Sequence, residues 1–280
     1  MGFRLTSRIA YLLRVGSVKR SGGLTQRLTK AGSIGTQTAR RGFFMHILES
    51  DMFDFLEREQ LLLGQENIHL LSQSRVAVIG LGGVGGTAVE GLARCGVGHL
   101  LVMDYDCFQL SNLNRQILAT RQTIGRAKAE VAKERILSIN PEAEVVCVPQ
   151  QLTQETLAVL EDFQPDFVID AVDQVTAKLL LIEWTKEKGI PSICCLGTGN
   201  RLTAQFTIGE LSDTAGCGCP LARIMRRECR TRGFENVQVL YSTLAPEETG
   251  VRTPQSISFV PPVAGYLLAG HAVRTLLGVK

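Results

Sequence analysis

The sequence predicts an α/β fold built on a doubly wound, mostly parallel sheet. From Arg75 onward, short apolar runs rich in β-branched residues alternate with segments of helical periodicity. The runs are apolar throughout, which is typical of parallel strands that helices cover on both faces. Strands that alternate with helices form parallel βαβ units, and the connections between such units are long enough to place helices on the sheet.

Five apolar runs are expected to form buried strands: residues 76–79, 100–103, 145–148, 167–169 and 192–196. Helical patterns lie between them, at about 84–95, 126–139, 153–162 and 174–188. After Gly199 we expect two further strands, a basic helix and a last helix, at 205–208, 237–242, about 220–232 and about 263–277. The chain shows no internal repeat and no linker after residue 48. The sequence therefore predicts one domain over residues 49–280, with an elaborated C-terminal part.

The composition excludes a disordered or fibrous chain. Of the 280 residues, 45% are apolar and 20% are charged, which is enough apolar material to bury a core. Eight cysteines occur without a secretory signal, so a reducing compartment is expected. No apolar run reaches the roughly 18 residues needed to cross a bilayer, and the sequence therefore predicts no transmembrane segment.

Residues 1–48 differ from the rest of the chain. They hold nine Lys or Arg and no Asp or Glu, whereas the remainder is mildly acidic. Leu5, Ile9 and Leu12 form one helical apolar face among arginines, which resembles a mitochondrial presequence. Alternatively, Met45 is the true start and the basic leader is a mis-called or disordered extension. The expected location is cytoplasmic, or mitochondrial if the leader is a presequence.

A glycine-rich motif, GLGGVG, directly follows the first expected strand and opens a helix. Its glycines are Gly80, Gly82, Gly83 and Gly85. Glycines at these positions allow a tight turn, and they let backbone amides and the positive end of a helix approach phosphate groups. The alternative is a tight turn without a ligand. The strand before the motif and the helix after it favour nucleotide binding.

Asp104 and Asp106 end the second expected strand, where a carboxylate can accept hydrogen bonds from ribose hydroxyls. Up to this point an NAD-dependent dehydrogenase fits equally well. The motif SNLNRQ, with Asn114 and Arg115, and the motif GRAK, with Lys128, then add cations near the phosphate end. A dinucleotide needs little added cation, whereas a triphosphate under attack needs its growing charge neutralised. These residues favour a triphosphate.

Asp173, in the motif DAVD, follows the fourth expected strand. The carboxyl ends of parallel strands form the edge of the sheet where ligands bind. Mg²⁺ is a hard cation that prefers carboxylate oxygen, and the sequence therefore predicts Asp173 as a metal ligand.

The motifs GLGGVG, DYD, SNLNRQ, GRAK and DAVD occur in this order, and over residues 52–280 the chain resembles the E1-like (ThiF-type) adenylating superfamily of ubiquitin-type activating enzymes. The resemblance implies a Rossmann-like fold that binds ATP and Mg²⁺. It places Asp104 on the ribose and Asp173 on the metal, with Arg115 and Lys128 on the phosphates. The nucleotide-binding residues that it implies are Gly80, Gly82, Gly83, Gly85, Asp104, Asp106, Asn114, Arg115, Lys128 and Asp173.

The same resemblance implies a homodimer. Arg58, in the segment REQLLLG, matches the arginine that the superfamily supplies across the dimer interface to the partner's ATP. Arg58 would then act in catalysis together with Arg115, Lys128 and Asp173. The alternative for Arg58 is a solvated helix residue.

Within the superfamily, activators of carrier proteins usually hold zinc with two CxxC pairs, and this sequence contains no CxxC. The segments VTAK, LGTGNRL, CPLARIMRRECRTRG and SFVPPVAGYLLAG are instead similar to the tRNA threonylcarbamoyladenosine dehydratase branch. That resemblance implies ATP-dependent dehydration, by cyclisation, of N6-threonylcarbamoyladenosine in tRNA through activation of its carboxylate. Cys217 and Cys219 are candidate catalytic thiols or ordinary loop cysteines, and a sulfur-transfer or redox partner is possible.

Three other functions stay open. An activator of a ubiquitin-like or sulfur-carrier protein C-terminus would use the same adenylation site. A nucleotide-sensing or scaffold protein would bind ATP without chemistry, which the complete set of Arg115, Lys128 and Asp173 disfavours. The third is an NAD oxidoreductase. The cations Arg115 and Lys128 disfavour it, because a dinucleotide needs little added cation.

The basic helix expected at 220–232 offers a surface for tRNA. Its arginines at Arg223, Arg226, Arg227 and Arg230 follow the spacing i, i+3, i+4 and i+7, which places them along one stripe. Such a stripe suits successive phosphates on an otherwise acidic body. The alternative is a solvated arginine face or a dimer contact.

Overall fold

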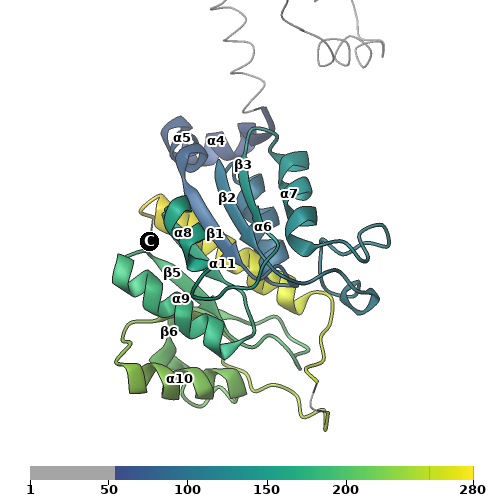
Figure 1. Ribbon diagram of the computed structural model, residues 1–280, viewed down its shortest axis with the longest axis vertical. Helices are drawn as coiled ribbons and strands as arrows, with labels where there is room; N and C mark the ends of the chain where they lie inside the picture. The colour runs from purple at the N-terminus through teal and green to yellow at the C-terminus, as the bar shows by residue number, and fades with distance from the viewer. Residues whose placement is uncertain (1–53, 252, 280) are drawn as a thin grey trace, which may run out of the picture. The chain divides into compact units, whose positions relative to one another are not determined.

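The structure, a computed structural model, describes residues 54–251 and 253–279 (Figure 1). The expected basic leader, residues 1–48, and the alternative start at Met45 lie outside the described residues. From Asp54 onward the chain forms one compact unit. In this described part, no helix is both long enough and apolar enough to cross a membrane.

The core of the fold is a seven-stranded sheet in the order β3-β2-β1-β4-β5-β7-β6. All neighbouring strands are parallel except β6, which pairs with β7 in the antiparallel direction. The expected α/β fold with a mostly parallel sheet is therefore confirmed. The strands are β1 (Arg75–Ile79), β2 (His99–Met103), β3 (Glu144–Val148), β4 (Phe167–Asp170), β5 (Ser192–Cys195), β6 (Thr207–Glu210) and β7 (Gln238–Tyr241).

Helices cover both faces of the sheet (Figure 1). The α-helices are α4 (Glu57–Leu63), α5 (Gln65–Gln73), α6 (Gly85–Arg94), α7 (Lys128–Ile139), α8 (Leu157–Phe163), α9 (Val175–Lys188), α10 (Pro220–Arg232) and α11 (Val260–Leu276). Within residues 54–251 and 253–279 there are also three short 3₁₀ helices, η1 (Asp54–Leu56), η2 (Leu110–Asn112) and η3 (Leu211–Thr214). The last helix begins three residues earlier than expected, because the first turn of a helix tolerates proline at Pro261 and Pro262.

The central strand β1 explains the two layers. Its side chains alternate between the faces, so Val76 and Val78 pack in one apolar cluster with α6, α7 and α11. Ala77 and Ile79 pack in a second cluster with α8 and α9. Because both faces are covered, every residue of this strand after Arg75 is buried, as its continuous apolar run predicts.

Strand β3 departs from the prediction. Residues 145–148 were expected to be buried throughout, but Val146 is exposed and Val145 and Cys147 are only partly buried. The cause is the strand's position, since β3 is an edge of the sheet and pairs with β2 alone. An edge strand has one partner and thinner cover, and an apolar run does not reveal which strand lies at the edge.

Candidate active site

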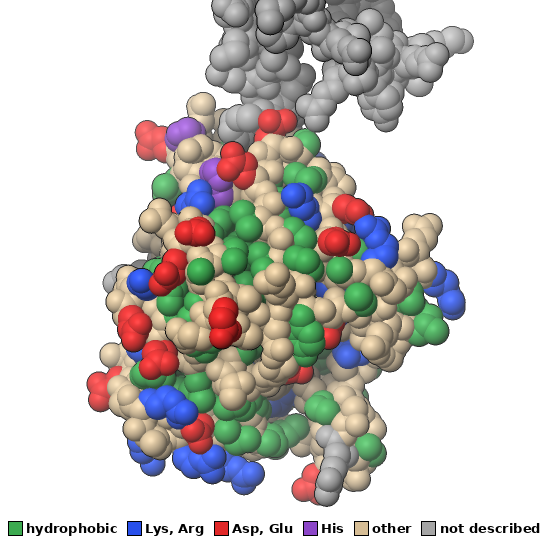
Figure 2. Space-filling model, in the orientation of Figure 1, with side chains coloured by type: hydrophobic (Ala, Val, Ile, Leu, Met, Phe, Trp, Pro, Cys, Tyr) green, Lys and Arg blue, Asp and Glu red, His purple; other side chains and the backbone are tan. Residues whose placement is uncertain are grey.

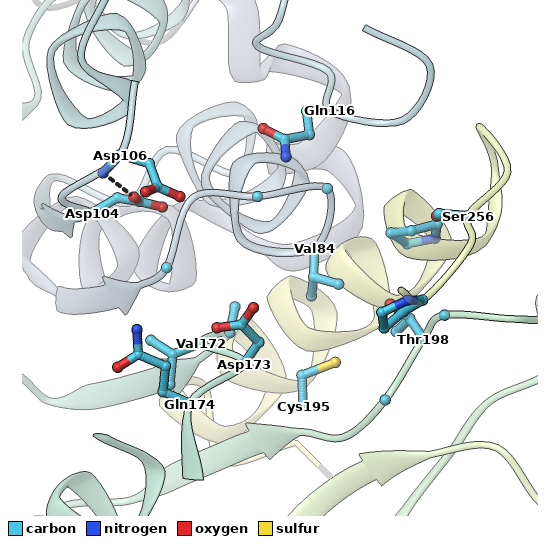
Figure 3. Close-up of a pocket in the computed structure, with 18 of the residues that line it drawn as sticks. Val84, Asp104, Asp106, Gln116, Val172, Asp173, Gln174, Cys195, Thr198 and Ser256 are labelled. Carbon is cyan, nitrogen blue, oxygen red and sulfur yellow. Dashed lines mark hydrogen bonds between the residues drawn. The ribbon is translucent and has the colours of Figure 1, made fainter. Parts of the chain in front are cut away.

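A cleft of about 840 Å³ opens at the carboxyl ends of β1, β2, β4 and β5 (Figure 3). The chain passes from β1 to β2 and β3 on one side of the sheet and returns to β4 and β5 on the other. This reversal of strand order is the position where open α/β sheets bind ligands. Every loop that carries one of the sequence motifs meets the cleft there.

The glycine loop between β1 and α6 forms one wall of the cleft. Gly80, Gly82 and Gly83 line the cleft, but Gly85 does not. Gly80 has φ 88°, a left-handed conformation that favours glycine. A Cβ atom at Gly85 would lie 1.7 Å from the carbonyl oxygen of Gly80. Gly85 therefore serves the tight packing of the loop, whereas the other three glycines line the cleft.

Asp104 binds the glycine loop from the end of β2. Its Oδ2 accepts a hydrogen bond from the Leu81 amide at 2.6 Å, and its Oδ1 accepts one from the Asp106 amide at 2.9 Å. Burial raises the pKa of the Asp104 carboxyl group, while nearby Lys128 and the two amides act in the opposite direction. Asp104 thus holds the glycine loop in place and also lines the cleft.

Lys128 opens α7 and lies among acidic residues. Its Nζ donates a hydrogen bond to Asp106 Oδ2 at 2.7 Å and lies 3.8 Å from Asp104 Oδ2. The Lys128 side chain is buried, while that of Asp106 is about half exposed. The family resemblance implies that Lys128 binds the phosphates, and the structure places this residue at the cleft beside the two aspartates.

Arg115 lines the cleft, whereas the exposed Asn114 does not. Arg115 Nη1 donates hydrogen bonds to Ser111 O at 2.8 Å and to Asn114 Oδ1 at 3.0 Å. The Asn114 Nδ2 group donates to Ser256 O at 3.0 Å. Asn114 was predicted to bind the cofactor, but it is not among the residues that line the cleft. The structure gives it a positioning contact to Arg115 instead.

Asp173 reaches into the cleft from the loop after β4 (Figure 3). Its side chain is exposed and has no hydrogen-bond partner among the described residues. In the same part of the chain, no group of three or more His, Cys, Asp or Glu side chains is placed to hold a metal ion. Mg²⁺ is commonly held by one or two carboxylates plus substrate phosphates, so a single free carboxylate beside the glycine loop fits this ion.

Several cleft residues escaped the sequence analysis. Tyr105, Asn112 and Gln116 lie within the DYD and SNLNRQ motifs but were given no role there, and Gln150, Gln151 and Gln174 lie outside the motifs; all six line the cleft. Behind them Lys178 of α9, in the segment VTAK, is fully buried and pairs with Asp170. The sequence analysis used VTAK only as a segment of family resemblance and gave its lysine no role. The structure shows that this lysine pairs with Asp170.

The three cysteines near the cleft differ in whether they line it. Cys195 and Cys219 line the cleft, while Cys217 does not, although all three are buried. Burial raises the pKa of the Cys195 thiol to about 12, so this thiol is protonated near neutral pH. A catalytic thiol and a sulfur-transfer or redox partner stay predictions.

Arg58 lies on α4, outside the residues that line the cleft, and its side chain is exposed.

The arginine stripe on α10 is interrupted. Arg226 Nη1 donates hydrogen bonds to Thr214 O at 2.6 Å and to Thr214 Oγ1 at 2.7 Å. Arg223, Arg227 and Arg230 are exposed, and Figure 2 shows basic side chains gathered over α10 at the lower edge of the view.

A family model described as the ThiF family matches residues 56–280. The tRNA threonylcarbamoyladenosine dehydratase of Bacillus subtilis (strain 168) is 36% identical over 245 residues, which are 81% of this chain and 96% of that protein. The protein of the same name from Escherichia coli (strain K12) is 36% identical over 193 residues, 66% of this chain and 71% of that protein. The solved structure of E. coli tRNA N6-threonylcarbamoyladenosine dehydratase in complex with ATP aligns with a TM-score of 0.75 and 31% identity, covering 81% of this chain and 95% of that chain.

Proposed function

The chain belongs to the ThiF family, and we propose that it works there as an ATP-dependent tRNA threonylcarbamoyladenosine dehydratase. One observation carries the proposal: a single cleft collects the glycine loop, the aspartates, the cations and Asp173, and it lies in a chain that is 36% identical to the B. subtilis dehydratase over 96% of that protein. Cytoplasm and mitochondrion both contain tRNA, so the proposal fits either location.

ATP binding is the part of the function that the comparisons support most directly, since the E. coli relative was solved with ATP. In this chain the amides of Gly82 and Gly83 would bind the phosphates at the start of α6. Asp104 would accept hydrogen bonds from the ribose. Asp173 would hold Mg²⁺, which when bound neutralises phosphate charge.

The chemistry requires an activated carboxylate. In the proposed reaction, a carboxylate oxygen of the threonylcarbamoyl group attacks the α-phosphorus of ATP, the bond to the bridging oxygen breaks, and pyrophosphate leaves. An atom of the urea group then attacks the activated carbonyl carbon, the ring closes, AMP leaves, and the urea proton passes to solvent. Because nucleophile and acceptor belong to one molecule, their effective molarity is of the order of 10⁵ M or more, and no enzyme nucleophile is needed.

The cations of the cleft supply the electrostatic part of this reaction. Arg115 and Lys128 both line the cleft, and their charge would offset the negative charge that grows between the α- and β-phosphates. Lys128 exchanges its contact with Asp106 for the phosphates when ATP enters. Asn114 holds the Arg115 side chain through its Oδ1, which limits the freedom that Arg115 would lose on binding.

The test is nucleoside mass spectrometry on modified tRNA incubated with the purified protein, ATP and Mg²⁺. We expect an ATP-dependent loss of one water, about 18 mass units, under mild conditions that preserve the ring. An unchanged nucleoside, together with pyrophosphate exchange that requires a carrier protein ending in Gly-Gly, would instead make the chain a carrier activator. Omission of Mg²⁺ is the matched control for the metal.

We also propose that the chain is a homodimer in which Arg58 completes the partner's site. Arg58 shares one face of α4 with Leu61 and Leu62, because residues three and four apart are neighbours on a helix. Both leucines are more than 80% exposed, at 84% and 82%. An apolar pair beside a cation is suited to an interface that buries the leucines and presents the arginine.

Complementation tests the dimer. Arg58→Ala and Asp173→Ala each lose activity, but a mixed dimer carries one complete site when Arg58 acts across the interface. Mixing equal amounts of the two variants therefore restores roughly a quarter of the wild-type activity, since half of the dimers are mixed and each has one working site of two. No recovery on mixing, in protein shown by light scattering to be dimeric, would place Arg58 outside the partner's site.

For tRNA we propose that Arg223, Arg227 and Arg230 contact phosphates. All three are exposed on α10, whose first residues, Pro220 and Leu221, line the cleft. A polynucleotide that lies along this helix would therefore approach the cleft. Electrostatic contacts of this kind give affinity without reading sequence.

A further inference from the structure

The cleft continues beyond the nucleotide motifs into a second part, which we call the acceptor compartment. It is lined by three segments, residues 195–201, 219–221 and 254–256, and Figure 3 shows Cys195, Thr198 and Ser256 around it. None of these segments belongs to the glycine loop or to the motifs that carry Asp104, Lys128 and Asp173. The nucleotide-binding residues therefore do not account for this compartment.

Arg201 is the cation of the acceptor compartment. It is 6% exposed, and it is the only side chain charged at neutral pH among the described residues of the three segments. Its Nε donates a hydrogen bond to Gly197 O at 3.3 Å, and its Nη1 donates one to Leu244 O at 2.5 Å. Both acceptors are neutral carbonyl groups.

The Arg201 charge has no counterion in the described part of the chain. No carboxylate there lies within 4.0 Å of it, and its Nη2 group makes no hydrogen bond to a described residue. Arg201 also lines the cleft. A nearly buried cation without a counterion is costly, and an anion entering the cleft would offset that cost.

The start of α10 adds a second positive feature to the same compartment. This helix has 13 residues, begins with Pro220 and has no side-chain hydrogen bond at its N-cap, Cys219. The amides of Leu221 and Ala222 donate to no described residue. Unpaired amides and the helix dipole favour an anion at this position, and Leu221 itself lines the cleft beside Cys219.

Asn200 holds the compartment in shape. Its φ of 56° lies in the left-handed region that non-glycine residues rarely adopt. Three hydrogen bonds support this conformation: its amide donates to Gln255 O at 2.7 Å, its Oδ1 accepts from the Gln255 amide at 2.6 Å, and its carbonyl accepts from the Glu247 amide at 2.7 Å. The residue next to Arg201 thus ties its own loop to two points of the loop between β7 and α11, and a strained residue held in this way is typical of functional sites.

We infer that Arg201 and the start of α10 bind the carboxylate of the substrate before ATP activates it. The inference rests on the proposed function, because the threonylcarbamoyl group carries that carboxylate. Arg201 could in principle bind a phosphate group of ATP, which is also an anion. In the proposed function, however, the glycine loop, Arg115 and Lys128 bind the phosphates, and these residues line another part of the cleft. The planar guanidinium group also matches the geometry of a carboxylate.

The test compares two ligands that differ in one charge. The nucleoside N6-threonylcarbamoyladenosine and its neutral carboxamide are titrated into the full-length protein loaded with a non-hydrolysable ATP analogue. We expect wild-type protein to prefer the carboxylate by roughly 10- to 100-fold, the range of a charge-assisted hydrogen bond. In Arg201→Gln this preference is lost while the carboxamide binds as before, and in Arg201→Lys part of the preference returns.

The matched control is Arg121→Gln, an exposed arginine that does not line the cleft, which keeps the full preference. Unchanged binding of the carboxamide shows that Arg201→Gln is folded. A preference that survives in Arg201→Gln would overturn the inference, and so would an equal loss of ATP affinity, which would assign the cation to the phosphates. Failure of wild-type protein to dehydrate modified tRNA would contradict the proposed function instead, which is a separate measurement.

Discussion

The ammonium group of Lys178 lies 3.1 Å from Oδ1 of Asp170, and both side chains are buried behind the cleft. Lys178 Nζ also donates a hydrogen bond to Cys195 O at 2.8 Å, and the same Asp170 oxygen accepts one from the Val172 amide at 3.1 Å. The pair therefore joins α9 to the ends of β4 and β5. It also fixes the first residues of the loop that carries Asp173.

Lys178→Met should destabilise the protein by about 3–5 kcal/mol, because removal of one partner leaves the Asp170 carboxylate buried without compensation. Urea denaturation measures the loss. Lys188→Met is the matched control, since Lys188 pairs with Glu161 at 3.0 Å but both side chains are about half exposed, and the free energy of unfolding should hardly change. The double variant Lys178→Met, Asp170→Asn should lose less than Lys178→Met alone, and a larger loss would contradict the ion-pair interpretation.

Asp173→Ala should abolish ATP use without unfolding the chain. The side chain is exposed and has no partner among the described residues, so stability should change by less than about 0.5 kcal/mol. Pyrophosphate release with modified tRNA should fall roughly a hundredfold or more. Asp162→Ala, an exposed aspartate on α8 away from the cleft, should keep wild-type turnover. Turnover that survives in Asp173→Ala would remove this residue from the site.

The triple variant Arg223→Ala, Arg227→Ala, Arg230→Ala should bind tRNA more weakly, because these exposed residues are placed to contact phosphates. The slope of log affinity against log salt concentration should fall by about one for each phosphate that the variant no longer neutralises. Filter binding at several salt concentrations measures both quantities. Arg274→Ala, an exposed arginine on α11, is the control, and an equal effect there would mean that net charge alone governs binding.

Arg226 should behave differently from the rest of the stripe. Its guanidinium group donates two hydrogen bonds to Thr214, and these join α10 to η3. Arg226→Ala should therefore lower the free energy of unfolding by about 2 kcal/mol. In the folded protein its salt slope for tRNA should stay close to that of wild type. A reduced slope with unchanged stability would return Arg226 to the tRNA surface.

Two glycines of α11 should respond in opposite ways to the same change. A Cβ atom at Gly265 would lie 2.3 Å from the carbonyl oxygen of Val84, the residue before α6, whereas at Gly270 nothing lies within 4 Å. Gly265→Ala should cost about 1–3 kcal/mol through overpacking, and it should weaken ATP binding because α6 follows the glycine loop. Gly270→Ala should add about 0.5 kcal/mol through helix propensity. Thermal unfolding of both variants checks the contrast, which similar effects would contradict.

The free energy of unfolding should decrease as the pH drops below about 6.5, because of His271. Burial, and secondarily Arg274, lowers the pKa of this imidazole, and its ring packs edge-on against Phe167 with centroids 5.9 Å apart. The unfolded chain then binds the proton first, so stability is complete above the unfolded pKa and is lost as pH falls toward the folded pKa. Urea unfolding at pH 7.5 and 5.5 measures the change. His271→Phe should reduce it, while the exposed His69→Gln should not.

Local sequence determined most of the architecture. Continuous apolar runs identified the strands because both faces of a parallel sheet are covered, and the positions of α10 and the glycine loop followed from periodicity and from motif spacing. The same patterns identified Asp104, Arg115, Lys128 and Asp173, since motifs that follow successive parallel strands meet at one edge of the sheet. These features depend on residues that are close together in the chain.

Only the tertiary structure decided the features that depend on residues far apart in the chain. The order of strands placed β3 at an edge and left it partly exposed. Asn114 hydrogen-bonds to Ser256, 142 residues away, and does not line the cleft. Arg226 hydrogen-bonds to Thr214 on a different element, unlike the other arginines of its stripe. Arg201 gained its significance from the absence of any described carboxylate near it. Periodicity and spacing report neighbours along the chain, whereas counterions and hydrogen-bond partners are chosen by the packing of distant segments.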